Sequence, residues 1–74
     1  MADGALDVRT KEMIYLAISS NNGCEYCQAS HGVAARKAGM TEEMFGELIA
    51  VVAMANETNR LVEGYSVPLD EALK

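Results

Sequence analysis

The first third of the chain carries apolar residues at helical spacing. Neither Gly nor Pro interrupts residues 7–20, and residues three and four apart share one face of a helix. We predict a helix from about Asp7 to Ser20, ended by the run Ser-Ser-Asn-Asn-Gly at 19–23, because short polar side chains and Gly favour turns. The same run offers candidate N-caps for the next helix. The apolar positions of the first helix are Met13, Ile14, Leu16, Ala17 and Ile18.

A second helix is predicted from about Cys24 to Ala38. Its last turn holds Arg36 and Lys37, and Gly39 follows directly after the helix. Basic side chains complement the free carbonyl groups at a helix C-terminus, and Gly is the residue most often found just beyond it. We therefore expect this helix to end in a tight corner.

Thr41 begins a third predicted helix, which runs to about Val62. Two glutamates follow Thr41 in the first turn, where the helix dipole favours negative charge. Met40 and Phe45 have the spacing of a hydrophobic staple, in which a residue before the cap packs against the second turn. Gly and Pro residues shortly beyond Val62 are expected to close the helix.

Residues 48–55 contain no polar side chain. A helix that is apolar around its whole circumference cannot face water on any side, so we expect another subunit to cover this segment. A β-strand is the alternative, since Val and Ile favour strands, but the capped pattern around the segment favours a helix. The prediction is an all-α fold in which residues 1–74 form a single domain.

Length and composition narrow the possibilities further. A chain of 74 residues buries only a small core, and two cysteines cannot supply a disulfide framework, so oligomerisation is the expected supplement. A net charge of −5 argues against binding nucleic acid, which is held through clustered Lys and Arg. No apolar run approaches the roughly 20 residues of a membrane helix, so we expect a cytoplasmic protein without a membrane partner. In a reducing compartment a close cysteine pair is typically catalytic, redox-sensing or metal-binding.

Cys24, Cys27 and His31 carry the candidate chemistry. Their spacings of three and four residues place the three side chains on one face of the second predicted helix. In the first helical turn, free N–H groups and the dipole would stabilise a Cys24 thiolate. His31 can stabilise a thiolate or exchange a proton with Cys27. The stripe continues through alanines at 34, 35 and 38, which let a neighbouring helix approach, so we expect a partly buried site whose thiols form and break a disulfide.

Two other interpretations of these residues remain open. Two thiolates and an imidazole are zinc ligands, and Glu12 could supply a fourth, although structural zinc usually draws its ligands from separated elements. The cysteines could also be inert core residues of a structural module. Taken alone, Glu12 is an acid on an apolar stripe, which usually indicates a solvated residue. No glycine pattern for a phosphate-bearing cofactor occurs, so we expect no cofactor.

Residues 8–60 resemble the AhpD-like alkylhydroperoxidases of the carboxymuconolactone decarboxylase superfamily. The resemblance rests on residues 11–19, on the Cys-Glu-Tyr-Cys motif at 24–27 with His31, and on residues 34–43. It implies that Cys27 is the peroxidatic thiol, which attacks a hydroperoxide and passes through a sulfenic acid, and that Cys24 then resolves it to a disulfide. It also implies that Glu12 and His31 form the proton relay that activates Cys27.

The resemblance implies partners as well. A dithiol donor such as a lipoylated protein would reduce the disulfide by reaching Cys24, and members of the family are commonly trimers or hexamers. Some members carry a second histidine between the cysteines, where this chain has Tyr26. A decarboxylase of the same superfamily is the enzymatic alternative. That activity does not depend on a redox cysteine pair, so Cys24 and Cys27 disfavour it.

Overall fold

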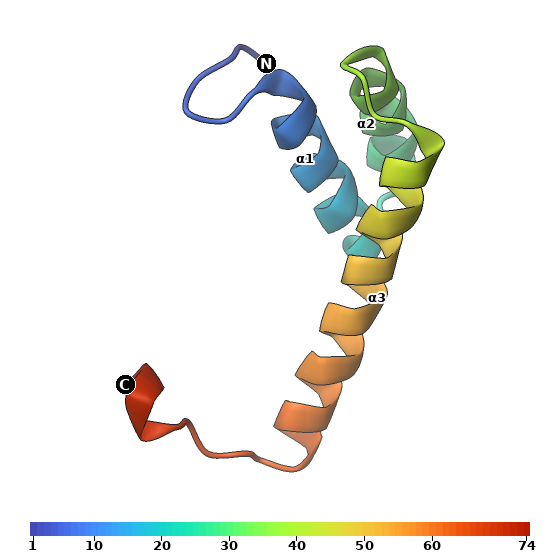
Figure 1. The fold of residues 1–74 in the computed structure, drawn as a ribbon. Coiled ribbons are helices and arrows are strands. Elements are labelled where there is room, and N and C mark those ends of the chain that lie inside the picture. The colour runs from blue at the N-terminus through green and yellow to red at the C-terminus, as the bar shows by residue number, and fades with distance from the viewer.

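The protein folds into three α-helices without a β-strand. The computed structural model describes residues 1–74. The elements are α1 (Val8–Asn22), α2 (Glu25–Lys37), α3 (Glu42–Gly64) and a short 3-10 helix, η1 (Glu71–Leu73). The all-α prediction is confirmed, and the strand alternative for residues 48–55 is wrong because they lie inside α3. Helices α1 and α2 pack against each other, and α3 extends past them toward the C-terminus (Figure 1).

Asp7 is the N-cap of α1 and accepts a hydrogen bond from the Thr10 amide at 2.7 Å. At the other end, a glycine ends α1 and turns the chain into α2. Gly23 adopts φ 73°, a left-handed conformation that Gly tolerates because it has no Cβ, and its N–H donates to the Ser20 carbonyl. The predicted end at Ser20 is wrong by two residues, because the serines and asparagines before Gly23 keep their helical hydrogen bonds.

Cys24 is the N-cap of α2, so its predicted place inside the first turn is wrong. Its backbone is extended, with φ −82° and ψ 97°, and the helix starts at Glu25. The structure ends α2 at Lys37, with Ala38 as the C-cap. Gly39 follows at φ 110° and forms the predicted corner before α3.

Thr41 caps α3 as predicted. Its hydroxyl accepts a hydrogen bond from the Met44 amide at 3.1 Å, and the Met44 sulfur accepts one from the Thr41 amide at 3.5 Å. The helix continues to Gly64, two residues beyond the predicted end at Val62. No Pro or turn-forming run stands between these two positions, so nothing stops the helical hydrogen bonds earlier.

The hydrophobic core is small and lies where the three helices approach one another. Leu16 of α1, Ala35 of α2 and Met40 of the corner are its buried members. The partly buried side chains packed against them are Met13, Met44 and Phe45. Met40 and Phe45 both pack at this core, as the hydrophobic staple predicted from their spacing requires. Only 6 of 74 residues are buried, so the core joins α1, α2 and the start of α3 but does not reach further.

An ion pair holds the corner between α2 and α3. Arg36 Nε lies 2.7 Å from Glu42 Oε1, and the guanidinium stands over the Phe45 ring at 5.0 Å. The hydrogen bond from Arg36 keeps the pKa of Glu42 below its ordinary value. A carboxyl with a lowered pKa stabilises the fold at neutral pH, and this contribution is lost as the pH falls through that lowered pKa.

Most of α3 has no partner within the chain. No residue of α3 is buried, and Val51, Met54 and Leu61 are 59%, 63% and 51% exposed. The radius of gyration is 15.0 Å, against about 11 Å for a compact chain of this length. The exposed surface is 5632 Å², against about 4,450 Å² for a compact monomer of this mass. None of the helices has the length and apolarity needed to cross a membrane.

The Thr41 cap provides a test of the fold. Replacing Thr41 by Ala leaves the first amides of α3 without an acceptor, so we expect the free energy of unfolding to fall by about 1 kcal/mol. Thr41→Ser keeps the hydroxyl and should unfold like the unmodified protein. Urea denaturation followed by circular dichroism at one protein concentration measures both variants. Equal midpoints for Thr41→Ala and the unmodified protein would contradict the assigned cap.

Candidate active site

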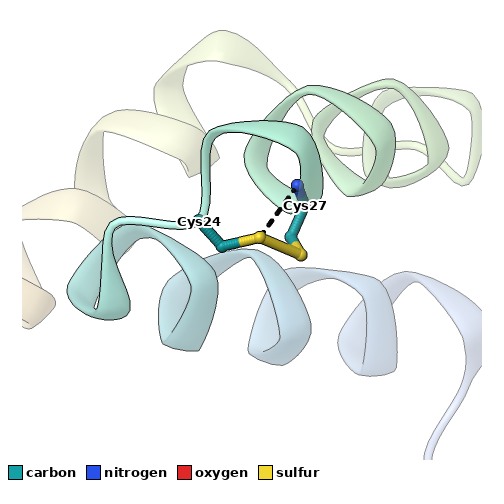
Figure 2. The surroundings of a disulfide bond; sticks show 2 residues. All are labelled: Cys24 and Cys27. Carbon is teal, nitrogen blue, oxygen red and sulfur yellow. Dashed lines mark hydrogen bonds between the residues drawn. A yellow bond between two sulfur atoms is a disulfide. The ribbon is translucent and has the colours of Figure 1, made fainter.

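The two cysteines are joined in a disulfide at the start of α2. Their Cα atoms are 5.2 Å apart, and the bond lies on the side of α2 that faces α1 (Figure 2). The amide of Cys27 donates a hydrogen bond to the Cys24 sulfur at 3.3 Å. An N-cap sulfur in this position meets the free amides and the positive end of the helix dipole, so the local structure favours a thiolate on Cys24 after reduction.

Glu12 of α1 meets His31 of α2 beside the disulfide. Glu12 Oε2 and His31 Nδ1 are 2.6 Å apart, and the two side chains are 7% and 23% exposed. Burying a carboxylate is unfavourable unless a partner satisfies it, and here His31 is that partner. The reading of Glu12 as a solvated residue is therefore wrong, because the packing of α1 on α2 removes it from water.

The contact with Glu12 determines what the imidazole can do. An ionised Glu12 only accepts hydrogen bonds, so beside the carboxylate form His31 Nδ1 is the donor of this bond. The second ring nitrogen, Nε2, is left free to accept a proton. Cys27 precedes His31 by four residues on the same helix face. This arrangement can move a proton between Cys27 and the imidazole.

Tyr15 also belongs to this cluster. Its ring stacks on the His31 ring, with centroids 3.6 Å apart and an angle of 20° between the planes. In the sequence, nothing in the cysteine motif points to Tyr15. The feature of the sequence that could point to Tyr15 is its position three residues after Glu12. This spacing places both side chains on one face of α1.

A pocket of about 270 Å³ opens beside the disulfide. Four residues of α1 line it together with the two cysteines, and they are Tyr15, Ile18, Ser19 and Asn22. Both cysteines and His31 are half-buried, as the small residues of the α2 stripe predict. A small molecule in this pocket would lie directly against the sulfur atoms.

Glu12, Cys24, Cys27 and His31, the set considered for zinc, are paired with one another in this oxidised structure. The two sulfurs are bonded to each other, and Glu12 is bonded to His31. No three side chains of the types that bind metal ions gather around a common point. The donor set present here is thus a disulfide next to a carboxylate–imidazole pair, which suits redox and proton chemistry.

Comparison with known proteins identifies the family. A model of the carboxymuconolactone decarboxylase family matches residues 1–69. The chain belongs to the carboxymuconolactone decarboxylase family. A crystal structure of the alkylhydroperoxidase AhpD core from Rhodospirillum rubrum has the same fold, with 49% identity and a TM-score of 0.91. The match covers 97% of this chain and 53% of that chain. The AhpD-like resemblance of the sequence is therefore confirmed.

A second relative of this carboxymuconolactone decarboxylase family member comes from Paracoccus denitrificans. It is described as uncharacterized protein 4 in the cox locus and is 44% identical over 52 residues, which are 70% of this chain and 47% of that protein. The chain therefore spans about half the length of each of these two relatives.

The contact between Glu12 and His31 yields a prediction about the Cys27 thiol. In a Cys24→Ser background, which leaves one thiol, we expect Glu12→Gln to slow alkylation by iodoacetamide at least about tenfold. The physical reason is that the amide cannot orient His31 as a proton acceptor as the carboxylate does. Glu47→Gln on the exposed side of α3 is the matched control.

A double-mutant cycle completes this test. Adding His31→Gln to Glu12→Gln should slow the reaction little further, because both changes remove the same relay. Circular dichroism checks that helix content is unchanged in each variant. Alkylation of the Glu12→Gln protein at the control rate would show that the pair does not act on Cys27.

Proposed function

We propose that the protein is a thiol-dependent hydroperoxide reductase. The observation that carries this proposal is the position of the Cys24–Cys27 disulfide beside the buried pair of Glu12 and His31. A redox pair stores two electrons, and a carboxylate–imidazole pair supplies the proton transfers that thiol chemistry requires. Membership of the family and 49% identity to a structure described as an alkylhydroperoxidase core support the same conclusion.

The proposed reaction starts with both cysteines reduced. His31 accepts the proton of Cys27, and the thiolate attacks the outer oxygen of a hydroperoxide. The O–O bond breaks, the proton goes to the leaving oxygen, and the products are an alcohol and a sulfenic acid on Cys27. Cys24 then loses its proton and its thiolate attacks the Cys27 sulfur. The S–O bond breaks, and the leaving hydroxide takes up a proton and departs as water. This step would form the same Cys24–Cys27 bond that the structure contains.

A dithiol donor would complete the cycle. Exchange transfers two electrons from the donor, which becomes a disulfide, and restores both thiols of the protein. A lipoylated protein is the donor class that we propose, acting on Cys24. The capping hydrogen bond from the Cys27 amide favours the thiolate form of Cys24 when it is released. None of these steps uses a bound cofactor. We propose a cytoplasmic location, because that compartment supplies reduced dithiols.

We also propose that the protein works as a homo-oligomer, a trimer or a hexamer. The support is the apolar surface of α3, which has no partner within the chain. The whole chain, with its polar atoms and exposed terminal segments included, exposes roughly 1,200 Å² more than a compact monomer of its mass, against the roughly 800 Å² that each partner contributes to a standard interface. A second copy of the chain would remove this apolar surface from water.

The two cysteines should respond differently to substitution. Cys27→Ser removes the attacking sulfur, so we expect no hydroperoxide consumption. Cys24→Ser keeps the attacking sulfur but cannot close the disulfide, so it should consume about one equivalent of hydroperoxide and then stop. Loss of an organic hydroperoxide measures both variants, with excess dihydrolipoamide for Cys27→Ser and with pre-reduced protein and no added dithiol for Cys24→Ser, because a free dithiol can itself reduce a sulfenic acid.

Two outcomes would contradict this assignment. Equal turnover by both variants would show that neither cysteine has the proposed role. A lactone decarboxylase activity that survives Cys27→Ser, with no hydroperoxide consumption by the unmodified protein, would favour the other activity named in the family description. Light scattering on the same samples measures the molar mass in solution. The mass of a single chain in a well-folded sample would contradict the proposed oligomer.

A further inference from the structure

The stacked ring of Tyr15 has no part in the reaction described so far. Building on the proposed role of Cys27, we infer that Tyr15 is a positioning residue that holds the His31 ring for proton exchange with the Cys27 thiol. Tyr15 contacts His31 by its aromatic face and also lines the pocket beside both sulfurs. It therefore lies where it can influence the relay without exchanging a proton itself.

Tyr15 and Glu12 restrain the imidazole in different directions. The hydrogen bond to Glu12 Oε2 fixes one ring atom, Nδ1, at 2.6 Å, but a single bond leaves the ring plane free to rotate about that atom. The Tyr15 ring lies 3.6 Å from the His31 ring and nearly parallel to it, which fixes the plane. Together the two contacts define the direction of Nε2, the nitrogen that is left to accept a proton.

The stack places the face of the Tyr15 ring against the ring on which charge develops during the proton transfer. Two neutral rings gain little from lying directly face to face, since their negative faces repel each other. An imidazolium over a tyrosine face is attracted to it, as other cations are. When the Cys27 proton moves to Nε2, the products are a thiolate and an imidazolium between Glu12 and Tyr15. Both neighbours then stabilise the charge that the transfer creates.

The rate of Cys27 alkylation tests this role directly. In the Cys24→Ser background, iodoacetamide reacts with the thiolate of Cys27, which displaces iodide. Tyr15→Leu removes the aromatic face and should slow alkylation about threefold to tenfold, the range that the loss of an aromatic pair implies. Tyr15→Phe keeps the face and should restore the rate. Tyr65→Leu is the matched control, because Tyr65 lies 81% exposed beyond α3.

The His31 NMR signals provide a second readout that a loss of general stability would not reproduce. His31 is the sole histidine of the chain, so its ring protons are assigned without ambiguity. A tyrosine ring at 3.6 Å shields them. We expect the signals to move downfield in Tyr15→Leu, and to stay near their original positions in Tyr15→Phe and Tyr65→Leu.

The results separate this inference from the proposed function. Alkylation at the control rate in Tyr15→Leu, or equal slowing in Tyr15→Phe and Tyr15→Leu, would overturn the role of Tyr15. Unshifted His31 signals in Tyr15→Leu would overturn it too. Failure of the unmodified protein to consume hydroperoxide would contradict only the proposed function, because alkylation reports on the Cys27 thiolate without any hydroperoxide.

Discussion

The hydrogen bond between Glu12 and His31 is the contact on which the site depends. It joins the middle of α1 to the middle of α2 across 19 positions of sequence, with only 7% of the Glu12 side chain exposed. A carboxylate in such surroundings is held by its partner, and the carboxylate in turn orients the imidazole ring. The same packing of α1 on α2 that buries Leu16 and Ala35 thus also prepares an imidazole to accept a proton.

The position of the disulfide depends on the turn between α1 and α2. Gly23 ends α1 in a left-handed conformation, and the next residue, Cys24, becomes the cap of α2 with its sulfur against the Cys27 amide. One sulfur therefore meets a helix N-terminus, and the other lies one turn from His31. We interpret this division as the reason that two chemically similar thiols can take different roles, one as the attacking group and one as the resolving and leaving group.

Local signals in the sequence predicted most of the fold, and contacts between helices account for what they missed. The Thr41 cap and the glycine corners depend only on neighbouring residues, so the three helices could be located from local sequence. The polar run before Gly23 continues the helix past the predicted end, because the preference of these residues for turns is weak against continued helical hydrogen bonds. The burial of Glu12 and the stack of Tyr15 on His31 depend on how α1 meets α2, which no local pattern records. The apolar surface of α3 is exposed in the single chain. That another subunit covers residues 48–55, which contain no polar side chain, stays a prediction.

A count of free thiols before and after exposure to hydroperoxide tests whether Cys24 and Cys27 form a redox couple. The reduced protein contains two cysteines, and the account predicts that both thiols disappear after one equivalent of an organic hydroperoxide and return after treatment with a dithiol. Labelling followed by mass spectrometry would locate the bond between Cys24 and Cys27. If both thiols stay free while the hydroperoxide remains unconsumed, the cysteine pair is not a hydroperoxide-reducing couple and the account is wrong.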